Sequence, residues 1–217
     1  MIARFAMKTA TRSAILLTIA AQTSLCQITA PKEARVMNVL PTQSKSIAVT
    51  NATAHDVVKK LRSEGIRVCF EENSATSGDV VSFVEDESST TNLLQNVVAR
   101  LPGYAWYNPK GTDIVVVFPS ETSALTWNVS SLDATNVSFL DIVVKNDMLG
   151  LKQHDIIVFY RGFTQPLEFT VNARFRNKLI MECLNDLIVN RPGLCWTLVT
   201  NPRGKKVLAF QYVEVFL

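Results

Sequence analysis

The sequence predicts an α+β protein in which a β-α-β-β-α-β-β unit occurs twice in tandem, with helices packed between or against small sheets. The segment Ser46–Ile66, SIAVTNATAHDVVKKLRSEGI, matches Ser131–Leu151, SLDATNVSFLDIVVKNDMLGL, without gaps at a shift of 85 positions. A second set of landmarks, helix-ending Pro-Gly pairs and tight turns, recurs downstream. These are Pro102-Gly103 with Pro192-Gly193, and Asn108–Gly111 with Asn201–Gly204. A duplicated supersecondary unit is therefore the expected basis of the fold.

Each copy of the repeated segment reads as a strand, a helix cap and a helix. Thr53 and Ser138 occupy N-cap positions, where a hydroxyl accepts a hydrogen bond from an early helical amide. Asp56 and Asp141 stand three residues later, where a carboxylate can reach back to the amide of the cap. Apolar residues recur at helical spacing in the first copy: Ala54, Val57, Val58 and Leu61. The glycines that end the two predicted helices are Gly65 and Gly150.

The repeated segment also contains two glycosylation sequons. They begin at Asn51 and Asn136, and a third sequon begins at Asn128. Because helix capping accounts for the hydroxyl residue in two of the three, we interpret these residues as structural rather than as carbohydrate attachment sites.

The remaining periodicity predicts the same order of elements in both copies. Residues 45–119 form the first unit, with strands at Ile66–Phe70 and Val80–Val84, a helix carrying Leu94, Val97, Val98 and Leu101, and a hairpin of Tyr104–Tyr107 with Ile114–Phe118. Residues 124–217 form the second unit, with strands at Ile156–Tyr160 and Leu167–Val171 and a helix carrying Ile180, Cys183, Leu184, Leu187 and Ile188.

Residues 1–26 have the layout of a cleaved signal peptide. Three cations precede a short apolar run, and small residues stand at the end of the segment, so that a cut after Cys26 is expected. The cations are Arg4, Lys8 and Arg12. The run is shorter than the ~20 residues that span a bilayer, so no stable membrane span is expected after cleavage. Residues 27–44 read as a linker, and we expect an exported protein, periplasmic or extracellular.

Export would change the charge of the chain. The sequence has 22 Lys and Arg against 19 Asp and Glu, and loss of the three cations of residues 1–26 leaves 19 of each. A neutral protein lacks the basic surface that binds a phosphate backbone, so nucleic acid is not an expected partner. The hydrophobic fraction of 47% is enough to build a core.

The first unit resembles a known module. The Asn51-Ala-Thr53 motif and its helix, the run Gly65–Phe70, the Leu-rich helix ending at Gly103 and the hairpin ending at Asp113–Phe118 are similar to the short N-terminal (STN) domain shared by secretins and TonB-dependent receptors. The second unit, Leu125–Val215, resembles it more loosely. This resemblance implies two βαβ halves whose helices lie between two small sheets. It also implies a module that docks other proteins of the bacterial envelope and carries no catalytic residues.

The residues themselves suggest no catalytic centre, cofactor site or metal site. His55 and His154 lie far apart and have no further ligand at motif spacing. Neither a nucleophile elbow nor a phosphate-binding glycine loop is present in the sequence. We therefore expect no catalytic residue, no cofactor and no bound metal.

Three cysteines follow residue 26, namely Cys69, Cys183 and Cys195. In an oxidising compartment, Cys183 and Cys195 are the best candidates for a disulfide, because they belong to a helix and the strand that follows it. The alternative is that both are small core residues, since Leu93 and Ala105 stand at the matching positions of the first unit.

Three residues of the second unit, Trp127, Arg161 and Phe163, have no match in the first unit and are candidates for an interaction surface. The leading hypothesis is an exported, non-catalytic adaptor that binds another envelope or secreted protein. Small sheets with edge strands can accept an extended segment of a partner, which is the expected mode of binding.

Two alternatives to the adaptor stay open. One is a small exported hydrolase that uses Cys69 or carboxylates from Glu71-Glu72 and Glu85–Glu87. It predicts a deep pocket between the units that contains a carboxyl group of raised pKa or a thiol of lowered pKa. The other is a structural envelope protein that associates with itself.

Overall fold

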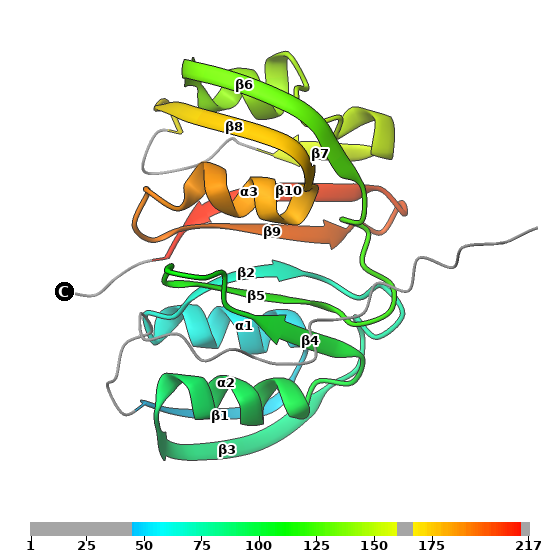
Figure 1. Ribbon diagram of the computed structural model, residues 1–217. Coiled ribbons are helices and arrows are strands. Elements are labelled where there is room, and N and C mark those ends of the chain that lie inside the picture. Colours follow the sequence, from blue (N-terminus) through cyan, green and yellow to red (C-terminus); the bar gives the residue numbers. More distant parts are fainter. Residues whose placement is uncertain (1–44, 160–166, 214–217) are drawn as a thin grey trace, which may run out of the picture. The chain divides into compact units, whose positions relative to one another are not determined.

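Strand pairing defines the architecture of residues 45–159 and 167–213, which are the residues that the computed structural model describes (Figure 1). These residues form a mixed α+β structure with two two-stranded sheets and one six-stranded sheet. The predicted signal peptide and linker, residues 1–26 and 27–44, lie outside the described residues, and so do Arg161 and Phe163.

The first half of the described chain, residues 45–119, forms seven elements. They are β1 (Lys45–Ala52), α1 (Ala54–Ser63), β2 (Arg67–Glu71), β3 (Val81–Ser88), α2 (Thr90–Ala99), β4 (Tyr104–Tyr107) and β5 (Ile114–Pro119). β1 pairs antiparallel with β3, β2 pairs parallel with β5, and β4 pairs antiparallel with β5. The helices α1 and α2 pack between the β1–β3 sheet and the strands β2, β4 and β5.

The second half begins after the connection at residues 120–127. Its elements are β6 (Asn128–Ser138), η1 (Asp141–Lys145), η2 (Lys152–His154), β7 (Ile156–Phe159), β8 (Thr170–Leu179), α3 (Ile180–Ile188), β9 (Leu194–Thr200) and β10 (Lys206–Tyr212). β6 pairs antiparallel with β8, β7 pairs parallel with β10, and β9 pairs antiparallel with β10. The predicted strand Leu167–Val171 is largely wrong: β8 contains only its last two residues and continues to Leu179, because it pairs with β6 along most of its length.

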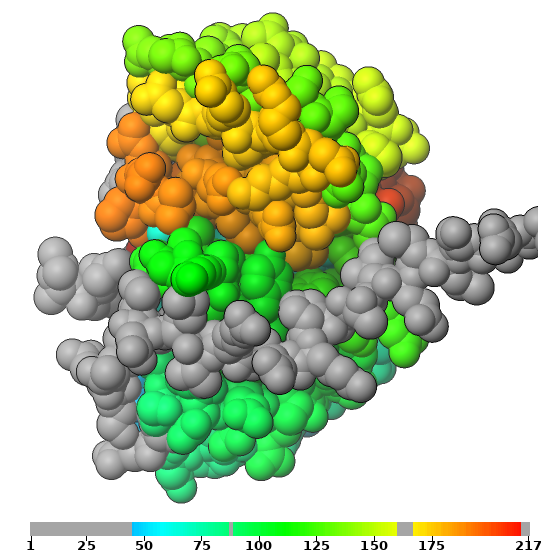
Figure 2. All heavy atoms as spheres, viewed as in Figure 1, coloured from blue at the N-terminus to red at the C-terminus, as the bar shows by residue number. Residues whose placement is uncertain are grey.

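The two halves share the six-stranded sheet, whose order is β4-β5-β2-β9-β10-β7. The joint is the parallel pair β2–β9, in which Phe70 is in register with Thr197. Figure 2 shows the orange atoms of the second half directly against green atoms of the first. The two faces of β2 belong to different cores: Val68 and Phe70 pack with α1 and α2, whereas Cys69 packs with residues of α3 and β9.

The start of α1 is as predicted. Thr53 Oγ1 accepts a hydrogen bond from the Asp56 amide at 3.2 Å, and Asp56 Oδ2 accepts one from the Thr53 amide at 3.2 Å, so the capping box is complete. The predicted apolar stripe is buried: Ala54, Val57, Val58 and Leu61. Gly65 adopts a φ of 75°, and its left-handed conformation ends the helix as expected.

The predicted cap at Ser138 is wrong. Ser138 remains in β6, in register with Thr170, and the short η1 has no side-chain cap. η1 is a π-helical turn in which the Asn146 amide donates to the Asp141 carbonyl five residues earlier, at 2.9 Å. Asp141 instead forms an i,i+4 ion pair with Lys145 at 2.7 Å.

The matching asparagines have a backbone role that capping did not predict. Asn51 has a φ of 47° and Asn136 a φ of 55°, and each lies where the register of its strand pair shifts. The Asn51 amide donates to Ser82 Oγ at 2.8 Å, and the Asn136 amide donates to Asn172 Oδ1 at 2.7 Å. Asparagine tolerates the left-handed region better than most residues, so it suits these bulges.

Candidate functional site

Of the three residues predicted to form an interaction surface, the structure describes only Trp127. Its indole Nε1 donates to the Leu149 carbonyl at 3.1 Å, and its ring stacks on His154 with the centroids 3.8 Å apart. Trp127 is half-buried against the core of the second half, and His154 is exposed. The stacked pair holds the connection between the halves against the turn before β7. The His154 imidazole is the exposed ring of the pair.

A polar hollow of about 370 Å³ lies where the connection between the halves crosses the ends of β2 and β9. Its lining comprises Glu71, Glu72, Ser74, Thr122, Ser123, Ala124, Thr126, His154, Leu198, Thr200 and Lys206. This hollow is the place at which the two halves bring acidic, basic and hydroxyl side chains together.

Glu71 is the buried carboxylate of this hollow and is only 2% exposed. It accepts a hydrogen bond from Ser123 Oγ at 2.7 Å and another from the Ala124 amide. Burial raises the pKa of Glu71, and the hydrogen bonds from Ser123 and Ala124 oppose that rise. Both oxygens are engaged by the connecting segment, so in this structure Glu71 fixes residues 123 and 124.

The described carboxylates among those considered for catalysis do not meet in one cleft. Glu71 and Glu72 line the hollow, and Glu72 accepts a hydrogen bond from the Thr200 amide at 3.3 Å. Glu85 lies on β3, where it forms an ion pair with Arg100, the residue after α2, at 2.7 Å. No group of three or more His, Cys, Asp or Glu side chains that could hold a metal occurs within residues 45–159 and 167–213.

The three described cysteines are buried free thiols. Cys183 Sγ lies 3.6 Å from the Lys178 carbonyl and Cys195 Sγ lies 3.4 Å from the Gln211 carbonyl, so the predicted disulfide between them is not formed in the structure. Burial raises the pKa of Cys183 to about 12 and raises the pKa of Cys69 even further. Cys69 is 0% exposed, so its protonated thiol is not accessible as a nucleophile in the structure.

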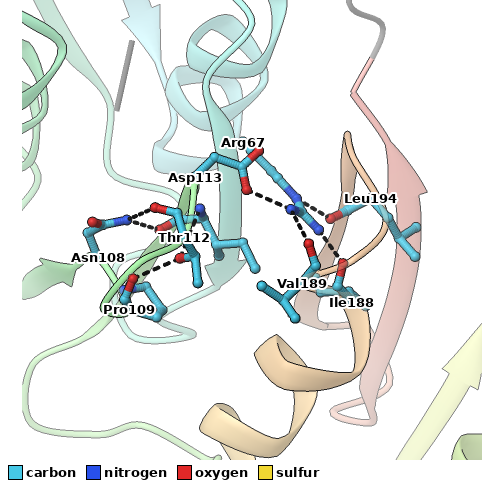
Figure 3. Close-up of polar contacts among 9 residues, drawn as sticks. Arg67, Asn108, Pro109, Thr112, Asp113, Ile188, Val189 and Leu194 are labelled. Carbon is cyan, nitrogen blue, oxygen red and sulfur yellow. Dashed lines mark hydrogen bonds and ion pairs between the residues drawn. The ribbon is translucent and has the colours of Figure 1, made fainter. Parts of the chain in front are cut away.

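Arg67, which is 4% exposed, makes polar contacts between the halves (Figure 3). Its Nε donates to the Leu194 carbonyl at 2.7 Å, and its Nη2 donates to the Ile188 carbonyl at 2.5 Å. Its Nη1 forms an ion pair with Asp113 at 2.7 Å. Because Ile188 is the last residue of α3, Arg67 places positive charge at the end of that helix, where its unpaired carbonyls lie.

A second buried arginine completes the joint from α1. Arg62 Nε donates to the Val68 carbonyl at 2.9 Å, and Nη2 donates to Thr197 Oγ1 at 2.8 Å. Sequence reasoning missed both arginines, because the partners that they contact in the second half lie far away in the chain. Arg62 could have been noticed in the sequence, because the repeat alignment places an acidic residue, Asp147, at the matching position of the second unit.

The far edge of the six-stranded sheet exposes apolar side chains. β10 is the only described strand that pairs with β7, and Ile157 and Phe159 of β7 are 48% and 53% exposed. Ile157 is in register with Val207 and Phe159 with Ala209, both half-buried. We call these four residues, Ile157, Phe159, Val207 and Ala209, the outer face. Sequence analysis did not single it out.

Comparisons with protein-family models, with curated proteins and with solved structures found no match for this chain. No helix among the described residues is both long enough and apolar enough to cross a membrane.

Proposed function

We propose that this chain is an exported, non-catalytic interaction module of the cell envelope, built from two tandem copies of one STN-like unit. Its partner would be another envelope or secreted protein, bound at an edge of the six-stranded sheet.

The duplication is supported by equivalent strand pairing in the two halves. The pairs β1–β3, β2–β5 and β4–β5 correspond to β6–β8, β7–β10 and β9–β10, with the same parallel or antiparallel sense in each case. The left-handed glycines also correspond: Gly65 with Gly150, Gly103 with Gly193, and Gly111 with Gly204. The STN-like assignment is supported by the position of α1 and α2 between the two-stranded β1–β3 sheet and the strands β2, β4 and β5.

The observation that carries the interaction proposal is the outer face. Apolar residues on an edge strand are a liability in a solitary protein, because the strand offers both unpaired backbone groups and side chains that favour burial. Ile157 and Phe159 are about half exposed on β7, the edge strand at that end of the sheet. A partner segment laid along β7 would gain backbone hydrogen bonds and bury these two side chains.

Photo-crosslinking from position 159 in cells tests this proposal. A photoreactive residue in place of Phe159 should give a crosslinked species of discrete mass, and Ile157→Lys in the same chain should abolish it. Val84 provides the matched control, since it is an apolar strand residue that is 63% exposed on β3 of a different sheet. Absence of a product from position 159, or an equal product from position 84, would contradict the proposal.

A hydrolase is the second candidate, and the hollow around Glu71 is the observation that favours it. A buried carboxyl group of raised pKa, in a hollow that His154 and Lys206 also line, has the protonation that a general acid needs. The test is turnover of ester, amide and glycoside substrates by the full chain. Activity that Glu72→Gln and Glu71→Gln both abolish would support the hydrolase, whereas activity indifferent to both would exclude this hollow as its site.

A further inference from the structure

From the way its own halves join, we infer that the partner at the outer face is a second copy of this chain, docked head to tail. This inference rests on the proposed tandem duplication and names the partner of the proposed interaction. The contact between chains would then have the same geometry as the contact between the two halves within one chain.

The internal joint brings together two unlike edges of the repeated unit. β2, the last strand in the order β4-β5-β2, pairs with β9, the first strand in the order β9-β10-β7. The two edges left free among the described strands are β7, which corresponds to β2, and β4, which corresponds to β9. One chain therefore carries both partners of the joint, one at each end of its sheet.

The side chains on β7 correspond to residues that the internal joint buries. Ile114 lies three residues after Gly111, and Val207 lies three residues after Gly204, so their partners Arg67 and Ile157 occupy matching positions. The same correspondence relates Cys69 to Phe159. Arg67 and Cys69 are 4% and 0% exposed under the second half, whereas Ile157 and Phe159 are 48% and 53% exposed.

Helices alternate between the two sides of the shared sheet. In register across the joint, Phe70 and Thr197 point to the same side, and so do Cys69 and Trp196. Phe70 faces α1 and α2, whereas Cys69 and Trp196 belong to the core that contains α3. Each successive half therefore has its helices on the opposite side from the half before it.

This alternation predicts what would cover the outer face. α3 extends over the first half far enough for Asn185 Nδ2 to donate to Tyr107 Oη of β4 at 3.2 Å. The next half in the series would be the first half of a second chain. Its α2 would lie over Ile157 and Phe159, since these residues lie on the side of the sheet that α1 and α2 occupy.

The resulting contact is heterologous, so it does not close on itself as a two-fold dimer does. The residue that corresponds to Arg67 is Ile157, and the residue that corresponds to Arg62 in the repeat alignment is Asp147, so neither position carries an arginine. The contact between chains would therefore lack the arginine contacts of the internal joint, and association would be reversible and dependent on concentration.

Sedimentation velocity of the full chain over a concentration series tests the inference. The average mass should rise with concentration past that of a dimer. Phe159→Lys should require at least about tenfold more protein for the same average mass, because it introduces a charge into a buried apolar contact. Phe159→Leu should retain association, and Val84→Lys is the control that should leave it unchanged. Thermal unfolding of each variant checks that it is folded.

Mixing two blocked variants tests the head-to-tail geometry. Leu94 and Leu184 match at a shift of 90, so Gln95, which is exposed on α2, corresponds to Asn185. At a concentration at which the parent chain associates, Phe159→Lys and Gln95→Arg should each be monomeric alone. When mixed they should form a one-to-one dimer, because each variant keeps the sheet edge that is blocked in the other. A Gln95→Arg variant that still dimerises alone would indicate a symmetric contact and overturn the inference.

A chain that stays monomeric at every concentration up to its solubility limit would also overturn the inference. The proposed interaction function would survive that result if position 159 still crosslinked to a different protein. If position 159 gave no crosslink either, both proposals would fail.

Discussion

β2 and β7 take equivalent places in the pairing of their halves, yet they have different surroundings. β2 lies between β5 and β9, and all of its residues from Arg67 to Glu71 are buried. β7 pairs only with β10 among the described strands, and its exposed residues Ile157 and Phe159 alternate with more buried ones. The comparison teaches that the same place in the strand pairing is buried where another half covers it and half-exposed where none does among the described residues. For β2, that covering half lies within the same chain.

Arg67→Ala should have the largest effect, because it removes a buried charged side chain that joins β2 to the second half. The Leu194 and Ile188 carbonyls would lose a charged donor in a buried place, and the free energy of unfolding should fall by about 3 kcal/mol. Urea denaturation measures the change. Arg174→Ala removes an exposed ion pair with Asp133 and should change the free energy of unfolding by less than about 1 kcal/mol. Equal effects of the two substitutions would contradict the role assigned to Arg67.

Thr53→Ala and Ser138→Ala compare the helix starts of the two halves. Thr53 caps α1, so its loss should lower the free energy of unfolding by about 1 kcal/mol. Ser138 caps no helix in the described structure, and its loss should have an effect near zero. The same urea titrations measure both variants. A matching loss for Ser138→Ala would mean that η1 begins with a cap, as the sequence alone suggested.

The ionisation of Glu71 should give the smallest of these changes in the free energy of unfolding. It should appear as a dependence of that free energy on pH. Burial raises the pKa of Glu71 above its ordinary 4.5, so the folded state holds this proton more tightly than the unfolded state. This stabilising contribution is complete below pH 4.5 and is lost as the pH rises through the folded-state pKa. Unfolding free energies between about pH 4 and about pH 8 should show this decline in the parent and not in Glu71→Gln.

Ser123→Ala provides the check on the sign of that prediction. The Ser123 hydroxyl donates to Glu71 and lowers its pKa, so its removal should raise that pKa further and extend the decline to higher pH. A decline that shifted to lower pH in Ser123→Ala would contradict the assignment of this hydrogen bond.

Local signals predicted the first half well. The capping box of Thr53 and Asp56, the stripe along α1 and the hairpin of β4 and β5 each depend on residues close together in the sequence, and all were confirmed. In the second half the same residue pattern produced η1 in place of a capped helix. The cap prediction failed because a serine that fits a cap also fits a strand, and the pairing of Ser138 with Thr170 decides between them.

The parts that sequence reasoning missed depend on distant partners. Arg67 and its acceptor Leu194 are 127 residues apart, and no periodicity relates them. The exposure of Ile157 and Phe159 likewise follows from the position of β7 at the end of a six-stranded sheet, which sequence analysis did not predict. Trp127 was singled out because it has no match in the other unit. Arg67 would have been found by the same comparison between the two units.

The β2–β9 pair makes the association of the halves less dependent on the peptide bonds that connect them. Ladder bonds, two guanidinium groups and a shared hydrophobic core hold the halves together, so the backbone of residues 120–127 is a covalent tether in addition to these contacts. Cleavage of that tether would leave two fragments still bound to each other. The loss would be one of effective concentration rather than of contacts, as in a protein reassembled from complementary pieces.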